Sequence, residues 1–319
     1  MNNITVSVIM MTYRHELYII HAIEGVRIQN CNFNVELLIA DDNSPDGTKN
    51  KVEDYLNSAD IPKNIDIKYF QHEKNKGPNN NYLWASKKAK GKYIANCEGD
   101  DYWIDPYKLQ RQVDVLEANP DLAMCTHEAS HQSTLVDNEK NLRRFLSIFV
   151  RDIQLYGFKR VIYLSYLLAV NRQQFWFQKR THDKHKRKTI SKLEDFKLNT
   201  WYMPMCSILM RSDFIDEIVY CISKSDGGHQ LTLLMGAMNG GIYHFKDIMA
   251  VKKDQENSVS KDKSRLKTIK ERDKNPQKNN RIKRFKALQE CAKNPEQVQI
   301  LQGMIDRELN RIKVDNIYH

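Results

Sequence analysis

Three acidic residues stand close together at the end of a predicted strand. Glu98, Asp100 and Asp101 follow the apolar run 92–97, which predicts a buried strand. Alternate side chains of an extended chain point to the same side, so Glu98 and Asp100 can face one site. Carboxylate oxygens are hard ligands for Mn²⁺ or Mg²⁺, and such a cation can neutralise a pyrophosphate. The motif predicts a divalent-cation site, and a solvated acidic turn is the alternative interpretation.

The first 126 residues alternate short apolar strands with longer amphipathic helices. Strands are predicted at 5–11, 35–40, 65–70, 92–97 and 122–126, and helices at 16–29, 46–56, 80–89 and 106–118. This alternation is typical of βαβ units and a mainly parallel sheet. Such sheets bind ligands beyond the carboxyl ends of their strands. The rule selects Thr12 with Tyr13 and Asp41 with Asp42, in addition to the acidic motif.

The rest of the chain is less regular. Residues 127–190 read as a helical insertion, and the sequence Ser191-Lys-Leu-Glu is a capping-box pattern that predicts the start of a helix. Further elements are predicted as a strand at 207–210, a helix at 231–238, a strand at 242–245 and, after 258, lysine-rich helices broken at Pro276 and Pro295. We therefore expect an α/β catalytic domain over 1–258 (parts 1–126, 127–190 and 191–258) and a basic helical region over 259–319.

A competing motif follows the fifth predicted strand. The run from His127 through Glu128 to His131 matches the H-E-x-x-H pattern of zinc peptidases. That chemistry needs both histidines on one face of a helix and a third ligand downstream. The residues after His131 are polar and show no apolar helical stripe, so we interpret the motif as a polar loop at the mouth of the sheet. A zinc peptidase is the alternative, and it predicts zinc bound at His127 and His131.

Five segments carry a second and larger pattern. They are Ser7–Tyr13, Ile39–Thr48, Asn75–Asn81, Gly91–Ala95 and Glu98–Trp103. In this order and spacing they resemble the inverting nucleotide-sugar glycosyltransferases of family two, over residues 4–126 closely and 191–250 loosely. The resemblance implies the A-type fold, a Rossmann-like mainly parallel sheet flanked by helices. It implies metal-dependent transfer from a UDP-sugar to a saccharide or lipid-linked glycan acceptor of the bacterial surface, with Mn²⁺ or Mg²⁺ as cofactor.

The resemblance also implies roles for individual residues. Tyr13 would lie against the uracil, Asp42 would bond the base, and Glu98 would approach the ribose. The implied donor-binding residues are Thr12, Tyr13, Glu16, Asp42, Asn81, Glu98 and Asp101, with Asp100 as the metal ligand. Two residues depart from the family pattern: Arg14 stands where relatives often carry Asn, and Glu98 stands where Asp is usual.

An inverting transfer also needs a general base that deprotonates the acceptor hydroxyl. In relatives this base is an acid just before a helix that runs into a glycine and a short strand. The matching turn here runs from Asp226 to His229, before the helix 231–238 and Gly240. Counting back from Gly240 selects His229, whereas chemistry favours Asp226, with His229 as its neighbour or an acceptor contact. The pair Glu194 and Asp195 is better explained as the first turn of a capped helix.

The positive charge of the chain is concentrated in two regions. Lys and Arg number 50 against 40 Asp and Glu, and residues 151–190 hold 10 basic and 2 acidic residues. Residues 251–319 hold 18 basic and 10 acidic residues. Solvated helix faces, an anionic membrane surface and a non-catalytic protein that binds nucleic acid or anionic lipid are the alternative explanations. We expect no nucleic-acid partner for the enzyme.

The cellular compartment is also an expectation from sequence. No apolar run reaches the roughly 18 residues of a membrane span, and no signal peptide is recognisable. Six irregularly spaced cysteines indicate free thiols in a reducing compartment. We expect a cytoplasmic protein with peripheral attachment to the inner face of the membrane.

Overall fold

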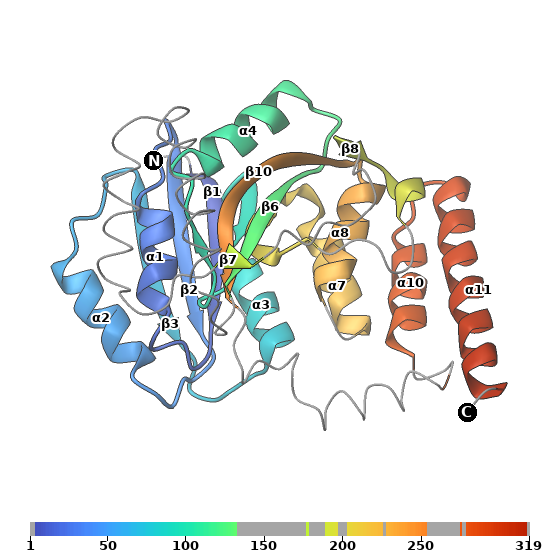
Figure 1. Cartoon of the computed structure of the whole chain (residues 1–319), viewed down its shortest axis with the longest axis horizontal. Coiled ribbons are helices and arrows are strands. Elements are labelled where there is room, and N and C mark those ends of the chain that lie inside the picture. Colours follow the sequence, from blue (N-terminus) through green and yellow to red (C-terminus); the bar gives the residue numbers. More distant parts are fainter. Residues whose placement is uncertain are drawn as a thin grey trace.

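One mixed β-sheet runs through the centre of the molecule, and helices cover both of its faces (Figure 1). The computed structural model describes residues 4–132, 177–178, 189–196, 203–225, 228–253, 275 and 279–317. The strands within these ranges are β1 (Ile4–Thr12), β2 (Asn34–Asp41), β3 (Ile65–Gln71), β4 (Tyr93–Asn96), β5 (Tyr102–Trp103), β6 (Met124–Gln132), β7 (Phe177–Gln178), β8 (Ile190–Ser191), β9 (Leu209–Arg211) and β10 (Ile242–Lys253). Their order is β3-β2-β1-β4-β9-β6-β10-β5, with β7 beside β6 and β8 beside β10.

The sheet is mainly parallel, as the sequence predicts. β1 pairs in parallel with β2 and β4, β2 with β3, and β6 with β10. β9 is antiparallel to both β4 and β6, so these two strands still run in the same direction. The short strands β5, β7 and β8 are antiparallel to their partners. The carboxyl ends of β1, β2, β4, β6 and β10 therefore lie along one edge of the sheet.

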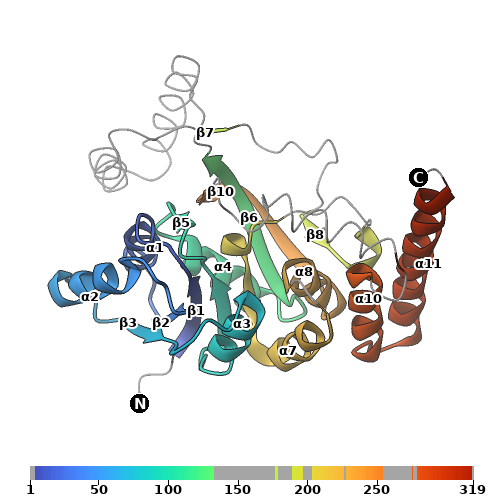
Figure 2. The same cartoon turned by 90° about the horizontal axis from the view of Figure 1, so that it is seen from below.

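Two layers of helices enclose the sheet. Their bounds are α1 (Ile19–Arg27), α2 (Thr48–Ser58), α3 (Pro78–Ser86), α4 (Lys108–Ala118), α7 (Ile215–Lys224), α8 (Gly228–Met238), α10 (Asn280–Glu290) and α11 (Pro295–Ile317). One apolar cluster joins the sheet to α1, α2 and α4, and the other joins it to α3, α7, α8, α10 and α11. Both views place α10 and α11 beside α7 and α8, away from α1 and α2 (Figures 1 and 2).

The first strand shows how the sequence specifies this arrangement. Val8 and Met10 contact one apolar cluster and Ile9 contacts the other. Successive side chains of a strand point to opposite faces, so a strand covered on both faces reads as an unbroken apolar run. The helices predicted in the first 126 residues and at 231–238 are confirmed to within three residues at each end. Two helices of the predicted tail, α10 and α11, lie among the described residues, and the predicted break at Pro295 is confirmed because α10 ends at Glu290 and α11 begins at Pro295. The predicted break at Pro276 lies outside the described residues.

Several sequence predictions are corrected. β6 continues to Gln132 and β10 to Lys253, well beyond their predicted ends at 126 and 245. The start of the insertion at residue 127 is therefore too early, while most of the predicted helical insertion, 133–176 and 179–188, lies outside the described residues. The helix predicted from Ser191 is a single 3-10 turn, Leu193–Asp195, because Phe196 is already extended. Helix α7 and strand β5 were not predicted. None of the described helices is long and apolar enough to cross a bilayer.

Candidate functional site

The loops that follow β1 and β2 are joined directly. Thr12 pairs in register with Asp41, and the backbone N–H of Asp42 donates to the carbonyl oxygen of Thr12 at 3.0 Å. The N–H of Arg14 donates to Ser44 Oγ, also at 3.0 Å. The sequence-predicted residues Thr12, Tyr13 and Asp42 therefore lie side by side. Thr12 and Asp42 are buried, whereas Tyr13 is 38% exposed.

Both loops turn through the left-handed region at a residue other than glycine. Arg14 and Asn43 each have φ of 61°. Asn adopts this conformation more readily than most residues, because its short polar side chain can bond locally. An Asn would therefore suit the backbone conformation at position 14. Arg14 takes the same conformation here, and its guanidinium lies 5.2 Å from the centroid of the Tyr13 ring.

Asp42 and Asn81 make their observed hydrogen bonds within the protein. The two carboxylate oxygens of Asp42 accept the N–H groups of Lys76 at 2.7 Å and Gly77 at 2.9 Å. Asn81 Nδ2 donates to the carbonyl oxygen of Ala40 at 2.9 Å, and its Oδ1 lies 2.9 Å from His72 Nε2. Asn81 is thus buried beneath the end of β2 and positions it. Each Asp42 oxygen keeps a second lone pair that could accept from a base.

Glu16 also contacts the neighbouring loop. Its Oε2 accepts the N–H of Gly47 at 3.0 Å, and its own N–H donates to Asp46 Oδ2 at 3.3 Å. Gly47 precedes α2, where helix N–H groups lack intrahelical partners. The contact gives Glu16 an observed role in holding the β1 and β2 loops together.

The acidic motif packs against the end of β1. The N–H groups of Cys97 and Gly99 donate to the carbonyl oxygens of Ile9 and Met11, which extends the β1–β4 pairing into the motif. A side chain on Gly99 would place its Cβ 2.9 Å from Thr12 Oγ1 and 2.7 Å from His15 Nδ1. Only glycine allows this close approach. The motif therefore lies directly beside the β1 loop, and His15 is a neighbour that the sequence reasoning missed.

The carboxyl groups of the motif are crowded and partly desolvated. Burial, and then the charge of Asp100, raises the pKa of Glu98 to about 7, while Lys252 opposes the shift. Burial and the same acidic neighbours raise the pKa of Asp101 well above its usual range. Asp101 Oδ1 accepts the N–H of Lys253 at 3.0 Å, and its Oδ2 is buried without a hydrogen-bond partner. A cation beside these groups would relieve both the repulsion and the orphaned oxygen.

The donor set fits Mn²⁺ or Mg²⁺ held partly by a substrate. Among the described residues, no three His, Cys, Asp or Glu side chains form a ready cage for a metal ion. Magnesium-type sites commonly use one or two carboxylates and complete their coordination with substrate phosphates and water. Asp100, which is only partly buried, can serve in this way.

Two lysines at the end of β10 complete this edge. Lys253 Nζ lies 3.9 Å from the centroid of the Tyr18 ring, and burial lowers the pKa of Lys253 to about 8. The charge of Lys252 acts on Glu98, Asp101 and also on His229. Lys252 is therefore within electrostatic reach of both the acidic motif and the first turn of α8. The sequence analysis did not select these two lysines, because the strand that it predicted ended at 245. Two basic residues at the carboxyl end of a longer predicted strand would have been recognisable.

The structure describes only one of the two candidate general bases, His229. His229 lies in the first turn of α8, at the same edge of the sheet. Burial, and then the charges of Lys252 and Arg284, lowers its pKa to about 4. The imidazole is therefore neutral at pH 7. Asp226 lies outside the described residues, so its role stays a prediction. Asp195 Oδ2 accepts the N–H of Lys192 at 3.1 Å, so this acid closes the turn at 193–195.

The zinc-peptidase geometry is absent from β6. His127 and His131 belong to this strand, so the predicted polar loop is wrong. Residues four apart in a strand are about 13 Å apart, too far to share one zinc ion. His127 is buried, and its Nδ1 lies 2.8 Å from the carbonyl oxygen of Glu128. The Glu128 carboxylate instead lies 3.1 Å from His244 Nε2.

Comparison with known proteins identifies relatives of this arrangement. The family model described as glycosyl transferase family 2 matches residues 7–216. An uncharacterised protein of Mycobacterium tuberculosis H37Rv is 37% identical over 121 residues, which is 38% of this chain and 34% of that protein. The Escherichia coli UDP-Glc:α-D-GlcNAc-diphosphoundecaprenol β-1,3-glucosyltransferase WfgD is 34% identical over 119 residues, 37% of this chain and 44% of that protein. The chain thus spans less than half the length of these relatives.

Solved structures show the same fold at low identity. S. aureus TarS 1–349 in complex with UDP superimposes with a TM-score of 0.58 and 15% identity, over 96% of this chain and 72% of that one. The mannosyltransferase PcManGT of Pyrobaculum calidifontis, in complex with GDP-Man and Mn²⁺, gives a TM-score of 0.54 and 13% identity, over 94% and 68%. The A-type α/β fold predicted from the sequence is confirmed.

Proposed function

The chain belongs to glycosyltransferase family 2, and on this premise we propose that it transfers a sugar from a UDP-sugar to a saccharide hydroxyl with inversion. One observation carries the proposal: the acidic motif lies against the joined ends of β1 and β2, with a buried and unpartnered oxygen on Asp101. Acidic groups beside two loops that are joined at the strand ends suit a nucleoside diphosphate and a divalent cation.

The residues divide the work between base, diphosphate and acceptor. Tyr13 offers an exposed ring on which uracil can stack, and Asp42 offers acceptor lone pairs for the imide N–H. Asp100 would hold Mn²⁺ or Mg²⁺, which supplies compensation for the charge that develops on the leaving diphosphate. Glu98 and Asp101 would contribute to the donor side of the site, and Asp226 or His229 would act on the acceptor hydroxyl.

We expect UDP to bind more tightly than GDP and to depend on Tyr13. Aromatic stacking on a base contributes on the order of 1–3 kcal/mol, so Tyr13→Ala should weaken UDP binding about tenfold or more. Asp42→Asn should reduce the preference for UDP, because it replaces an acceptor by a donor. Calorimetry with UDP and GDP in the presence of Mn²⁺ measures both effects.

A matched control separates the loss of base stacking from the effect of removing any exposed tyrosine. Tyr220 is 39% exposed in α7, where its hydroxyl donates to Glu290 of α10, and Tyr220→Ala should leave UDP affinity unchanged. Unchanged UDP affinity in both the Tyr13 and Asp42 variants would remove these residues from the pocket. A screen of UDP- and GDP-sugar hydrolysis then identifies the donor.

The acceptor that we propose is a glycan of the bacterial surface, including a lipid-linked one. The E. coli relative has a diphosphoundecaprenol acceptor in its name, which supports this class. Lipid linkage would bring the chain to an anionic membrane surface, where each basic residue contributes roughly 1 kcal/mol. Full-length protein should co-sediment with anionic vesicles and dissociate as salt rises, because the attraction is screened. Failure to bind anionic vesicles at low salt would refute membrane attachment.

A further inference from the structure

The tail helices contact α8 at both of its ends. At the carboxyl end, Gln297 Nε2 of α11 donates to the carbonyl oxygen of Met238 at 2.8 Å, and Lys293 Nζ donates to Asn239. At the amino end, Arg284 of α10 donates from its guanidinium to Gln230 Oε1. Gln230 follows His229 directly in the first turn of α8. The tail therefore reaches the residue next to a candidate base.

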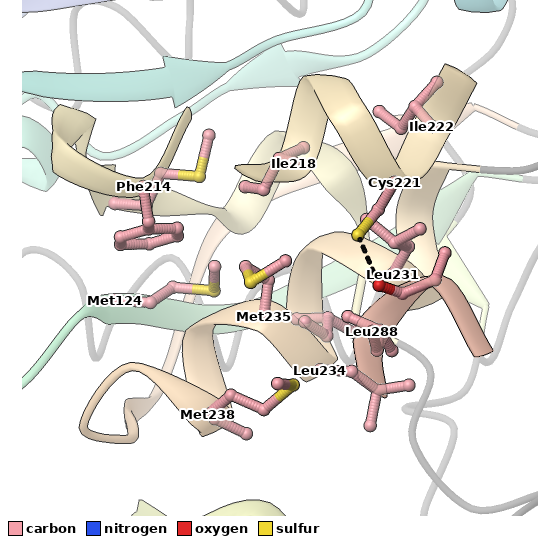
Figure 3. Packing of buried hydrophobic residues seen from close by; sticks show 14 of the residues in the cluster. Met124, Phe214, Ile218, Cys221, Ile222, Leu231, Leu234, Met235, Met238 and Leu288 are labelled. Atoms are coloured by element: carbon pink, nitrogen blue, oxygen red, sulfur yellow. Dashed lines mark hydrogen bonds between the residues drawn. The ribbon is translucent and has the colours of Figure 1, made fainter. Parts of the chain in front are cut away.

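Apolar packing fixes α10 against this helix. Ile282, Phe285 and Leu288 are buried in the same cluster as Leu231 and Leu234 of α8. Figure 3 shows Leu288 beside Leu231 and Leu234, with Cys221 of α7 bonded to the carbonyl oxygen of Ala287 at 3.4 Å. Buried apolar contacts of this kind define one position for α10.

A buried carboxylate sets the orientation of α10 relative to α11. Glu308 of α11 is fully buried and accepts from Asn279 Nδ2 at 3.1 Å and from Arg311 at 2.6 Å. Arg281 lies 3.5 Å from the same carboxylate. Asn279 also caps α10, because its Oδ1 accepts the N–H groups of Arg281 and Ile282. The start of α10 is thus anchored, and this anchoring presents Arg284 to α8.

We propose that Arg284 is a positioning residue for the acceptor side of the site, fixing the first turn of α8 through Gln230 and holding a positive charge beside His229. The inference rests on the proposed function and assigns the tail a part in it. Among the described residues, the charged groups that act on His229 are Lys252 from β10 and Arg284 from α10. Both disfavour the imidazolium, so they help to keep His229 neutral.

The test compares two tail contacts on the same helix. Arg284→Ala removes the contact at the amino end of α8, and Lys293→Ala removes the one at the carboxyl end. We expect both full-length variants to lose similar thermal stability and to bind UDP as the wild type does. Only Arg284→Ala should lower kcat/KM for the acceptor, by about tenfold, and Arg284→Lys should restore most of it. Gln230→Ala tests the same contact with the arginine in place.

A readout that does not require turnover separates this inference from the proposed function. NMR titration of His229 should show a higher pKa in Arg284→Ala than in the wild type, and an unchanged pKa in Lys293→Ala. Equal loss of activity in the two variants, or an unchanged His229 titration, would mean that Arg284 only stabilises the tail. If the wild type shows no sugar transfer while the titration shifts as expected, the proposed function fails and the positioning of His229 stands.

Discussion

Asp100→Asn is expected to abolish sugar transfer, with a loss on the order of 10³-fold, and to leave the fold intact. Asp100 lies in a partly exposed turn after β4, so the substitution removes charge without opening a cavity. A cation that stabilises developing charge contributes several kcal/mol, and about 4 kcal/mol corresponds to 10³ in rate. Steady-state turnover at saturating Mn²⁺, with circular dichroism as the check on folding, measures the effect.

Two further measurements make this prediction specific to the metal. Asp114→Asn removes an exposed carboxylate of α4 and should turn over as the wild type does. Mn²⁺ should strengthen UDP binding in the wild type and in this control but not in Asp100→Asn. Turnover of Asp100→Asn near the wild-type level would remove Asp100 from the metal site.

The first half of the fold was predictable mainly because its central strands are covered on both faces. A strand such as β1 or β2 has almost every residue buried, so it reads as an apolar run whose end is sharp. The residues at those ends were predictable for the same reason. Thr12, Asp42 and the acidic motif come together because parallel strands end at one edge. Their individual roles stay predictions, since register alone says nothing about ligands.

The second half of the sheet could not be predicted from alternation. The pairing of β10 with β6 shifts register between Phe245 and Ile248 and again before Ala250. Such bulges interrupt the alternation of buried and exposed residues. The predicted strand therefore ended at 245, and Lys252 was not recognised as lying at the end of a strand. The second half of β6 was missed for another reason. Thr126 and Glu128 both contact the imidazole of His244, so these polar residues are satisfied inside the fold. In the sequence alone, such polar residues indicate a loop.

The packing of the tail could not be predicted from its charge alone. Its basic residues suggested an exposed surface, yet Arg281 and Arg311 contact the buried Glu308, and Arg284 contacts Gln230. The apolar residues Phe285 and Leu288 place α10 in the core cluster. The described part of the tail therefore packs on helices α7 and α8, and membrane attachment is a separate prediction.

Asp226→Asn is expected to lower turnover by about 10²–10⁴-fold while leaving UDP affinity unchanged, because a general base acts on the acceptor hydroxyl in the transition state. His229→Ala should be less damaging, with a loss of about tenfold. The reason is the lowered pKa of His229, about 4, which makes the neutral imidazole a weak base at pH 7. A general base works best when its pKa is near the operating pH.

The pH dependence distinguishes the two residues. With its pKa lowered to about 4, His229 stays deprotonated from pH 5 to pH 8, so its ionisation contributes no change in rate across that window. A rise in kcat between pH 5 and 8 that survives in His229→Ala must come from another group, and its loss in Asp226→Asn would assign it to Asp226. If only His229→Ala collapses, and a rise in kcat between pH 5 and 8 disappears with it, then His229 is the base and our preference for Asp226 is wrong. UDP calorimetry on both variants shows whether either loss reflects the donor side instead.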